Sequence, residues 1–174
     1  GLLVAPAAEA GGDLLHVDFG ITYLGLNTDQ QQHAYVLREG ETDAPAGLKQ
    51  ALSVGNRLQD VLTAQFKTGR TGNEILKAAR TQAIAEGIDP KIYTHPLGFH
   101  GHAAGPTIGL WDQQDGVPGA GDYPLHPRTC YSIERNASVA IPEWGGKKVL
   151  IMLEEDASFD GAEVRYLDDR QRSF

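Results

Sequence analysis

Two helix-forming segments lie between groups of strand-forming residues, and this order is the feature that most constrains the fold. The first segment follows Asp43-Ala44-Pro45, a helix-start signal. Apolar or small residues then recur at steps of three and four, as on one face of a helix, at Leu48, Ala51, Leu52, Gly55, Leu58 and Leu62.

The second helical segment opens with Thr71-Gly-Asn-Glu74, the spacing of a capping box. Gly87 and then Pro90 are typical of its end. We expect one face to carry Ile75, Ala78, Ala79 and Ile84.

Strand-forming residues precede and follow these helices. Residues 14–19 and a run around 35–37 predict a hairpin that turns between Gly20 and Asn27, and further strands are expected at 93–99, 128–136 and 147–155. The loop from Asp112 to Pro127 is rich in Gly and Pro, which suits either an ordered active-site rim or an exposed excursion. The order of strands, two helices and strands predicts an α+β domain.

Composition narrows the class of protein. With 174 residues and 41% hydrophobic content, the chain suffices for one domain with a core. A formal net charge of -8 argues against nucleic-acid binding, and no apolar run approaches the roughly 20 residues of a membrane span. The start, Gly1 to Pro6, lacks the features of a signal peptide, so the compartment is either cytoplasmic or, after removal of a leader, exported. Cys130 is alone, which excludes an intrachain disulfide and suggests a buried strand thiol.

Candidate chemistry begins with the segment D-F-G-I-T-Y-L-G-L-N-T-D, from Asp18 to Asp29. Two carboxylates held across a tight hairpin can chelate one metal ion or bridge two. A second group is His95, His100 and His102. If a strand continued there, His100 and His102 would share one side and His95 would face the other, unless glycines bend the chain. Solvated loop histidines are the alternative interpretation.

Two glutamates stand in strand-like runs, Glu134 after Ser132-Ile133 and Glu154 after Met152-Leu153. Burying a carboxylate among apolar residues is costly unless it is paired or binds a metal. A hairpin centred near Trp144 would set Glu134 opposite Glu154. Taken singly, either is more often a solvated residue, but two Asp, two Glu and one His suit a pair of manganese, cobalt or zinc ions. Such a pair shares a bridging water, a nucleophile for hydrolysis, and leaves other histidines to bind the substrate carbonyl.

This order of ligands resembles the pita-bread metallopeptidases, the family of methionine aminopeptidase, aminopeptidase P and prolidase. The segment from Asp18 to Asp29 is similar to the family pattern D-x-G-x-x-Y-x-G-x-x-x-D, and Gly20 and Tyr23 favour the Xaa-Pro branch. His95, Gly98 and His102 fit H-x-x-G-x-x-x-H. Ile133-Glu134 and Leu153-Glu154-Glu155-Asp156 resemble the I-E-P-G and I-E-D segments.

The resemblance implies roles for these residues. It makes Asp18, Asp29, His95, Glu134 and Glu154 the metal ligands, with the two glutamates as bridging acids and Glu154 preferred over Glu155. It makes Glu134 the proton shuttle and His102 the residue that positions substrate. His100 is an extra imidazole, expected to bind substrate as a second oxyanion donor.

Three departures from the family patterns touch the substrate rim more than the metal ligands, and so bear on specificity. Arg135-Asn136 replaces Pro-Gly, Ala103 replaces an acidic residue, and Gln30-Gln31 stands where Xaa-Pro enzymes often carry Thr-Arg.

The fold implied is a curved antiparallel sheet with helices on one face, and residues 1–174 would form a single domain, the C-terminal part of a pita-bread catalytic domain. The helices expected before Leu14 are missing from the sequence, so we expect the chain to be a fragment of a longer protein.

The function implied is a dinuclear metal-dependent exopeptidase that hydrolyses Xaa-Pro bonds of small peptides through a metal-bridging hydroxide, with two divalent ions, manganese foremost and cobalt or zinc as alternatives. A homodimer is compatible with the resemblance. Two other functions stay open: a catalytically silent pita-bread module that binds peptides or a protein partner, and metal-independent hydrolysis of a small amidine-like substrate, as in creatinase. The intact ligand set disfavours both.

Overall fold

A computed structural model describes residues 11–174 of the protein. The first six residues, where we expect no signal peptide, lie outside the described residues. Within residues 11–174, no helix combines the length and the apolar character needed to cross a bilayer.

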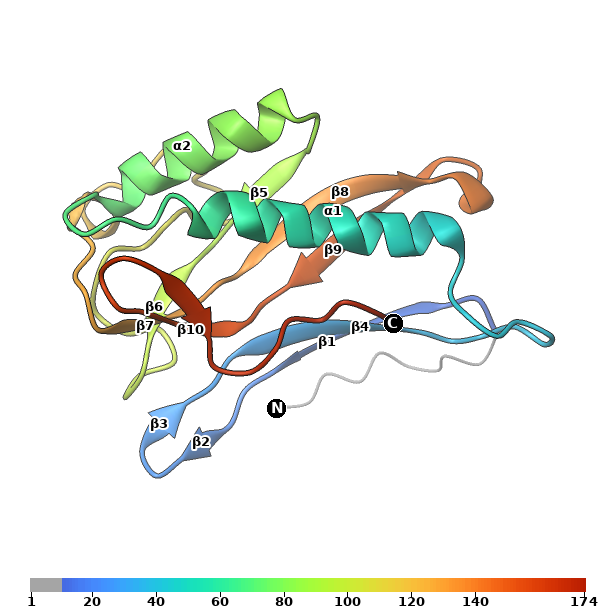
Figure 1. Ribbon diagram of the computed structural model, residues 1–174, viewed down its shortest axis with the longest axis horizontal. Helices are drawn as coiled ribbons and strands as arrows, with labels where there is room; N and C mark the ends of the chain where they lie inside the picture. The colour runs from blue at the N-terminus through green and yellow to red at the C-terminus, as the bar shows by residue number, and fades with distance from the viewer. Residues whose placement is uncertain (1–10) are drawn as a thin grey trace.

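The chain begins with the expected hairpin, drawn in blue in Figure 1. Strand β1 (Leu14–Phe19) pairs antiparallel with β4 (Gln30–Tyr35), and a smaller hairpin of β2 (Thr22–Tyr23) and β3 (Leu26–Asn27) lies between them. The sequence predicted the second long strand around residues 35–37. The structure places it earlier, directly after Asp29, and it ends at Tyr35. A search for apolar patterns misses this strand because most of its residues are polar.

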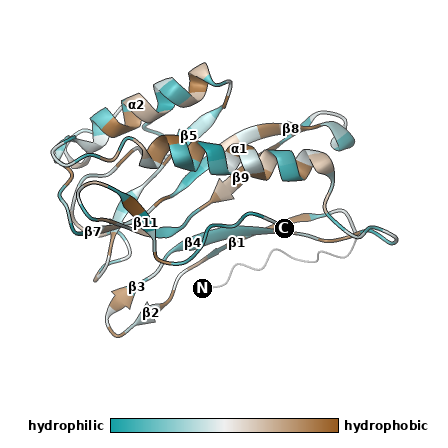
Figure 2. Ribbon diagram, viewed as in Figure 1, coloured by the Kyte–Doolittle hydropathy of each residue, from teal (hydrophilic) through white to brown (hydrophobic). Residues whose placement is uncertain are grey.

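Both predicted helices form. Helix α1 (Ala46–Thr63) buries every residue of its predicted apolar face. Helix α2 (Gly72–Ala85) opens with the predicted capping box: Thr71 Oγ1 accepts from the Glu74 N–H at 3.2 Å, and the Glu74 carboxylate accepts from the Thr71 N–H at 2.8 Å. Figure 2 shows apolar and polar residues alternating along both helices.

One position of the second helix was predicted wrongly. Ile84 is 55% exposed, whereas Leu76 and Ala83 are buried. Ile84 lies nine residues after Ile75, and at about 100° per residue this places it on the opposite side of the helix.

The strands after the helices form two antiparallel groups. One has the order β5 (Pro90–Ile92), β8 (Arg135–Ile141), β9 (Lys147–Leu153). The other has the order β11 (Val164–Tyr166), β10 (Asp156–Phe159), β7 (Thr129–Ser132), β6 (His95–Leu97). The single strand expected at 128–136 is therefore two strands, β7 and β8, which separate at Ile133-Glu134. Strand β6 is shorter than the expected 93–99, because the chain leaves the sheet at Gly98.

The hairpin of β8 and β9 has the predicted centre. Its turn is a short 3-10 helix at Pro142–Trp144, and Arg135 pairs with Leu153. This register brings the next residues, Glu134 and Glu154, to facing ends of the two strands.

The Gly- and Pro-rich loop at 112–127 packs against the start of α2. The Asn73 side-chain amide donates to the Val117 carbonyl at 3.1 Å and accepts from the Val117 N–H at 2.7 Å. A short 3-10 helix follows at Ala120–Asp122. The loop is thus an ordered part of the structure.

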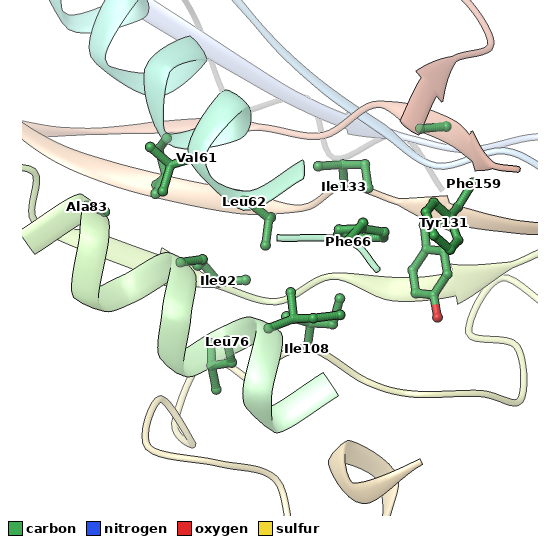
Figure 3. Close-up of a cluster of buried hydrophobic side chains, with 14 of the residues drawn as sticks. Val61, Leu62, Phe66, Leu76, Ala83, Ile92, Ile108, Tyr131, Ile133 and Phe159 are labelled. Carbon is green, nitrogen blue, oxygen red and sulfur yellow. The ribbon is translucent and has the colours of Figure 1, made fainter. Parts of the chain in front are cut away.

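Helices α1 and α2 lie on the same side of β5, β8 and β9, and the β1–β4 hairpin runs alongside β9, below it in Figure 1. The main core fills the space between helices and strands (Figure 3). Leu62 and Val61 reach it from α1, Leu76 from α2 and Ile92 from β5. The opposite face of the strands is left free to carry polar side chains.

Candidate metal centre

Three carboxylates surround the imidazole of His95, which is only 2% exposed. Nε2 of His95 lies 3.6 Å from Glu154 Oε1, 3.8 Å from Glu134 Oε2 and 3.9 Å from Asp29 Oδ2. These distances exceed those of hydrogen bonds. Asp29, His95 and Glu154 each offer a ligand atom within 4.8 Å of the others, a grouping able to hold a metal ion.

The hydrogen bonds of His95 leave one nitrogen without a partner. Nδ1 lies 3.2 Å from the Pro96 carbonyl oxygen, which can only accept, so Nδ1 carries the proton. Nε2 is buried and has no hydrogen-bond partner among residues 11–174. In the neutral imidazole its lone pair faces three carboxylates, and a cation between them would satisfy all four groups. The residues present therefore fit a metal ion.

These side chains meet because four chain segments change direction there. Asp29 immediately precedes β4, and His95 opens β6. Glu134 lies between β7 and β8, and Glu154 lies between β9 and β10. Each of the four residues lies at or next to the end of a strand, so its side chain can reach the common centre.

Polar neighbours hold the two glutamates. Ser132 Oγ donates to Glu154 Oε1 at 2.5 Å. The Gln31 amide nitrogen donates to Glu154 Oε2 at 2.5 Å and to Glu134 Oε1 at 2.6 Å. Both carboxylates are buried, so these donors replace the water they have lost.

The acids of the centre repel one another. Burial, followed by the charge of Glu154, raises the pKa of Asp29 to about 7. The same two causes raise the pKa of Glu134 well above its usual range. A divalent cation would reverse this balance, because it favours the charged form of each carboxyl group.

Asp18 borders the centre from β1. Burial and then the charge of Glu154 raise its pKa, while the nearby His102 lowers it. Together with Glu134 it lines a cavity of about 510 Å³. The remaining lining residues of this cavity are His16, Gln31, Asp89, Lys91, Trp111, Asn136, Ser138, Leu150 and Met152. The volume is suited to a small ligand.

The other two histidines have different surroundings. His102 stacks on His95, with ring centroids 4.1 Å apart and ring planes 23° apart. Burial, followed by the proximity of His95, lowers its pKa. His100 is exposed, and its ring contacts Phe99. Because β6 ends at Leu97, His100 and His102 do not share a strand face.

Glu155 lies on the other side of the strands from Glu154. Its carboxylate accepts from the Gln171 N–H at 3.1 Å. On the same side, the buried Arg135 guanidinium donates to the carbonyls of Ile133 and Leu153, the residues just before the two glutamates of the centre.

Three residues near the centre were not singled out as functional from the sequence. Gln31 was noted only as a departure from Thr-Arg. Asp156 accepts the Asp29 N–H at 3.2 Å, and Tyr93 lies against the rings of His95 and His102 at 5.3 and 5.8 Å. Asp156 ends the I-E-D-like segment, a signal that could have found it, whereas nothing in the sequence marks Tyr93.

Solved structures share this fold at low sequence identity. The X-Pro aminopeptidase from Thermotoga maritima is 23% identical with a TM-score of 0.68, and the match covers 94% of this chain and 41% of that one. Prolidase from Pyrococcus furiosus is 19% identical with a TM-score of 0.66, covering 93% and 43%. Methionine aminopeptidase from Thermotoga maritima is 19% identical with a TM-score of 0.62, covering 90% and 64%. The chain thus spans about two fifths of the length of the first two.

The fold is therefore the expected α+β pita-bread fold, represented here in part. A comparison with curated proteins gave no match. The model of the M24 metallopeptidase family matches residues 7–157, most of the chain. On this match the chain belongs to metallopeptidase family M24.

Proposed function

We propose that the protein containing this chain is a dinuclear metal-dependent exopeptidase that cleaves Xaa-Pro bonds. The observation that carries the proposal is the position of His95 Nε2. This nitrogen is buried, has no hydrogen-bond partner within the described part of the chain, and faces the carboxylates of Asp29, Glu134 and Glu154. A divalent cation placed among these groups would take the imidazole lone pair and offset the carboxylate charges. Membership of a metallopeptidase family supports the same interpretation.

Five residues would hold two divalent ions, manganese foremost: Asp18, Asp29, His95, Glu134 and Glu154. When bound, the ions supply activation of water for attack on a peptide carbonyl. We propose that Glu134 moves the proton, taking it from the attacking water and returning it to the leaving nitrogen.

Substrate would enter through the cavity beside Asp18 and Glu134. His102 is stacked on His95, and we propose that its imidazole donates to the substrate carbonyl as charge develops there. We propose the same role for His100, whose exposure leaves it available. The choice of Xaa-Pro rests on Gly20 and Tyr23 and on the relatives named X-Pro aminopeptidase and prolidase.

The test is hydrolysis of an Xaa-Pro dipeptide and of the matched Xaa-Ala dipeptide by the full-length protein, with manganese and with a chelator. We expect cleavage of the Xaa-Pro peptide only when metal is present. Glu154→Gln should lower kcat/KM by at least about a hundredfold, since even changes to groups behind metal ligands cost up to that much.

Glu155→Gln is the matched control, because Glu155 is adjacent in sequence and points away from the centre. Activity that survives chelation, or equal activity of the Glu154 and Glu155 variants, would contradict the proposal. A protein that binds metal and peptide without cleaving it would instead be the binding module.

A further inference from the structure

Gln31 occupies a position between the two glutamates of the centre. It is 3% exposed, and its amide nitrogen donates one hydrogen bond to Glu134 and one to Glu154. An amide nitrogen has two protons, so both are used.

The orientation of this amide is fixed. Gln31 Oε1 lies 3.0 Å from Nε2 of His16, which therefore donates to it. The reverse orientation would set the amide oxygen against two carboxylates, which is repulsive. The amide thus presents its donors to the acids and its acceptor to the imidazole.

The backbone of Gln31 is held as firmly as its side chain. Its N–H donates to the Glu154 carbonyl at 3.1 Å, and its carbonyl accepts from the Glu154 N–H at 3.2 Å. On the other side, Gln31 pairs with Asp18 across the β1–β4 ladder. The residue therefore links both parts of the centre through its backbone and its side chain.

Gln31 also determines which oxygens are left for a metal. It holds Glu134 Oε1 and Glu154 Oε2, while the other oxygen of each glutamate faces His95. We propose that Gln31 is a positioning residue that sets the spacing of Glu134 and Glu154 and so preorganises the centre for metal binding. This inference rests on the metal-binding half of the proposed function and not on the substrate.

The test measures manganese binding to the full-length protein by titration calorimetry. Gln31→Met keeps the volume and removes both donors, and we expect its Kd to rise by roughly tenfold to a hundredfold, the range seen when groups that orient metal ligands are lost. Gln32→Met is the matched control, because Gln32 is exposed on the other face of the same strand. Its Kd should equal that of the parent.

A double-mutant cycle separates positioning from a general loss of structure. His16→Phe removes the partner of Gln31 Oε1, and we expect a loss of a few fold in affinity. In the Gln31→Met background the same change should cost nothing further, because the amide it orients is gone. Thermal midpoints of the metal-free variants would identify any that do not fold, and Gln31→Asn, which keeps an amide too short to reach, provides a second variant.

The outcomes distinguish this inference from the proposed function. Equal Kd values for Gln31→Met and Gln32→Met would overturn the inference alone, as would additive losses in the cycle. Weaker binding by Gln31→Met in a protein that cleaves no peptide would support the inference and overturn the proposed activity. A folded parent that binds no manganese would overturn both.

Discussion

We predict that His33 makes the free energy of unfolding depend on pH. The side chain is 5% exposed and lies on β4. Its Nδ1 donates to the Leu15 carbonyl at 3.1 Å, and its Nε2 accepts from the Met152 N–H at 2.9 Å. Both bonds require the neutral imidazole, because a proton on Nε2 would face the Met152 N–H.

Burial lowers the pKa of His33 from 6.5 to about 4. Positive charge from His16 on β1 and Arg135 on β8 acts in the same direction, and the C-terminal tail adds the neutral Gln171 amide and the Phe174 ring. At about 1.4 kcal/mol per pKa unit, this shift corresponds to roughly 3 kcal/mol.

The sign follows from where the proton binds. Between about pH 4 and 6.5 the unfolded chain binds a proton at this position and the folded chain does not. The contribution to the free energy of unfolding is therefore complete above about pH 6.5, and it is lost as the pH falls towards 4.

The measurement is urea unfolding of the parent and of His33→Gln at several pH values from 4 to 7.5, all without metal. The acids of the metal centre act with the opposite sign, because their pKa values are raised, so the difference between the two proteins is the informative quantity. We expect the parent to lose roughly 3 kcal/mol more than the variant between about pH 6.5 and 4. Equal losses would refute the reasoning.

Two further predictions concern the helices. Thr71→Ala should lower the free energy of unfolding by about 1 kcal/mol, because it removes the cap of α2. Thr81→Ala is the control, because Thr81 is exposed within the same helix, and it should not lower this free energy. Equal losses of the two variants in urea unfolding would contradict the role of the cap. Gly55→Ala should be destabilising overall, although alanine favours helix by about 1 kcal/mol. Its Cβ would lie 2.7 Å from Cγ2 of Ile151, and such overpacking costs about 1–3 kcal/mol; a raised urea midpoint would show that the sheet yields there.

Sequence patterns predicted those parts of the fold in which apolar spacing and turn chemistry agree. The capping box at Thr71 predicted the start of α2. The turn centred on Trp144 predicted the β8–β9 hairpin and the register that sets Glu134 opposite Glu154. Both signals are local. They do not depend on what the rest of the chain does.

Other errors arise from contacts across the chain. Strand β4 was missed at its start because Gln31 and His33 are buried polar residues, and their partners come from distant segments. The position of Gln31 between the glutamates could not be predicted for the same reason. A departure from a family pattern can be noted in a sequence, but its contacts require the structure.

The β1–β4 hairpin is joined to the end of β9 by the bridge between Gln31 and Glu154, and this connection has a mechanical consequence. Asp18 and Asp29 belong to the β1–β4 hairpin, whereas His95, Glu134 and Glu154 belong to the strands beneath the helices. An ion that takes ligands from both sides would act as a cross-link between segments far apart in the chain. Metal binding would then restrict the movement of the β1–β4 hairpin relative to the other strands. The same ligands would therefore determine how far the two parts of the domain move together.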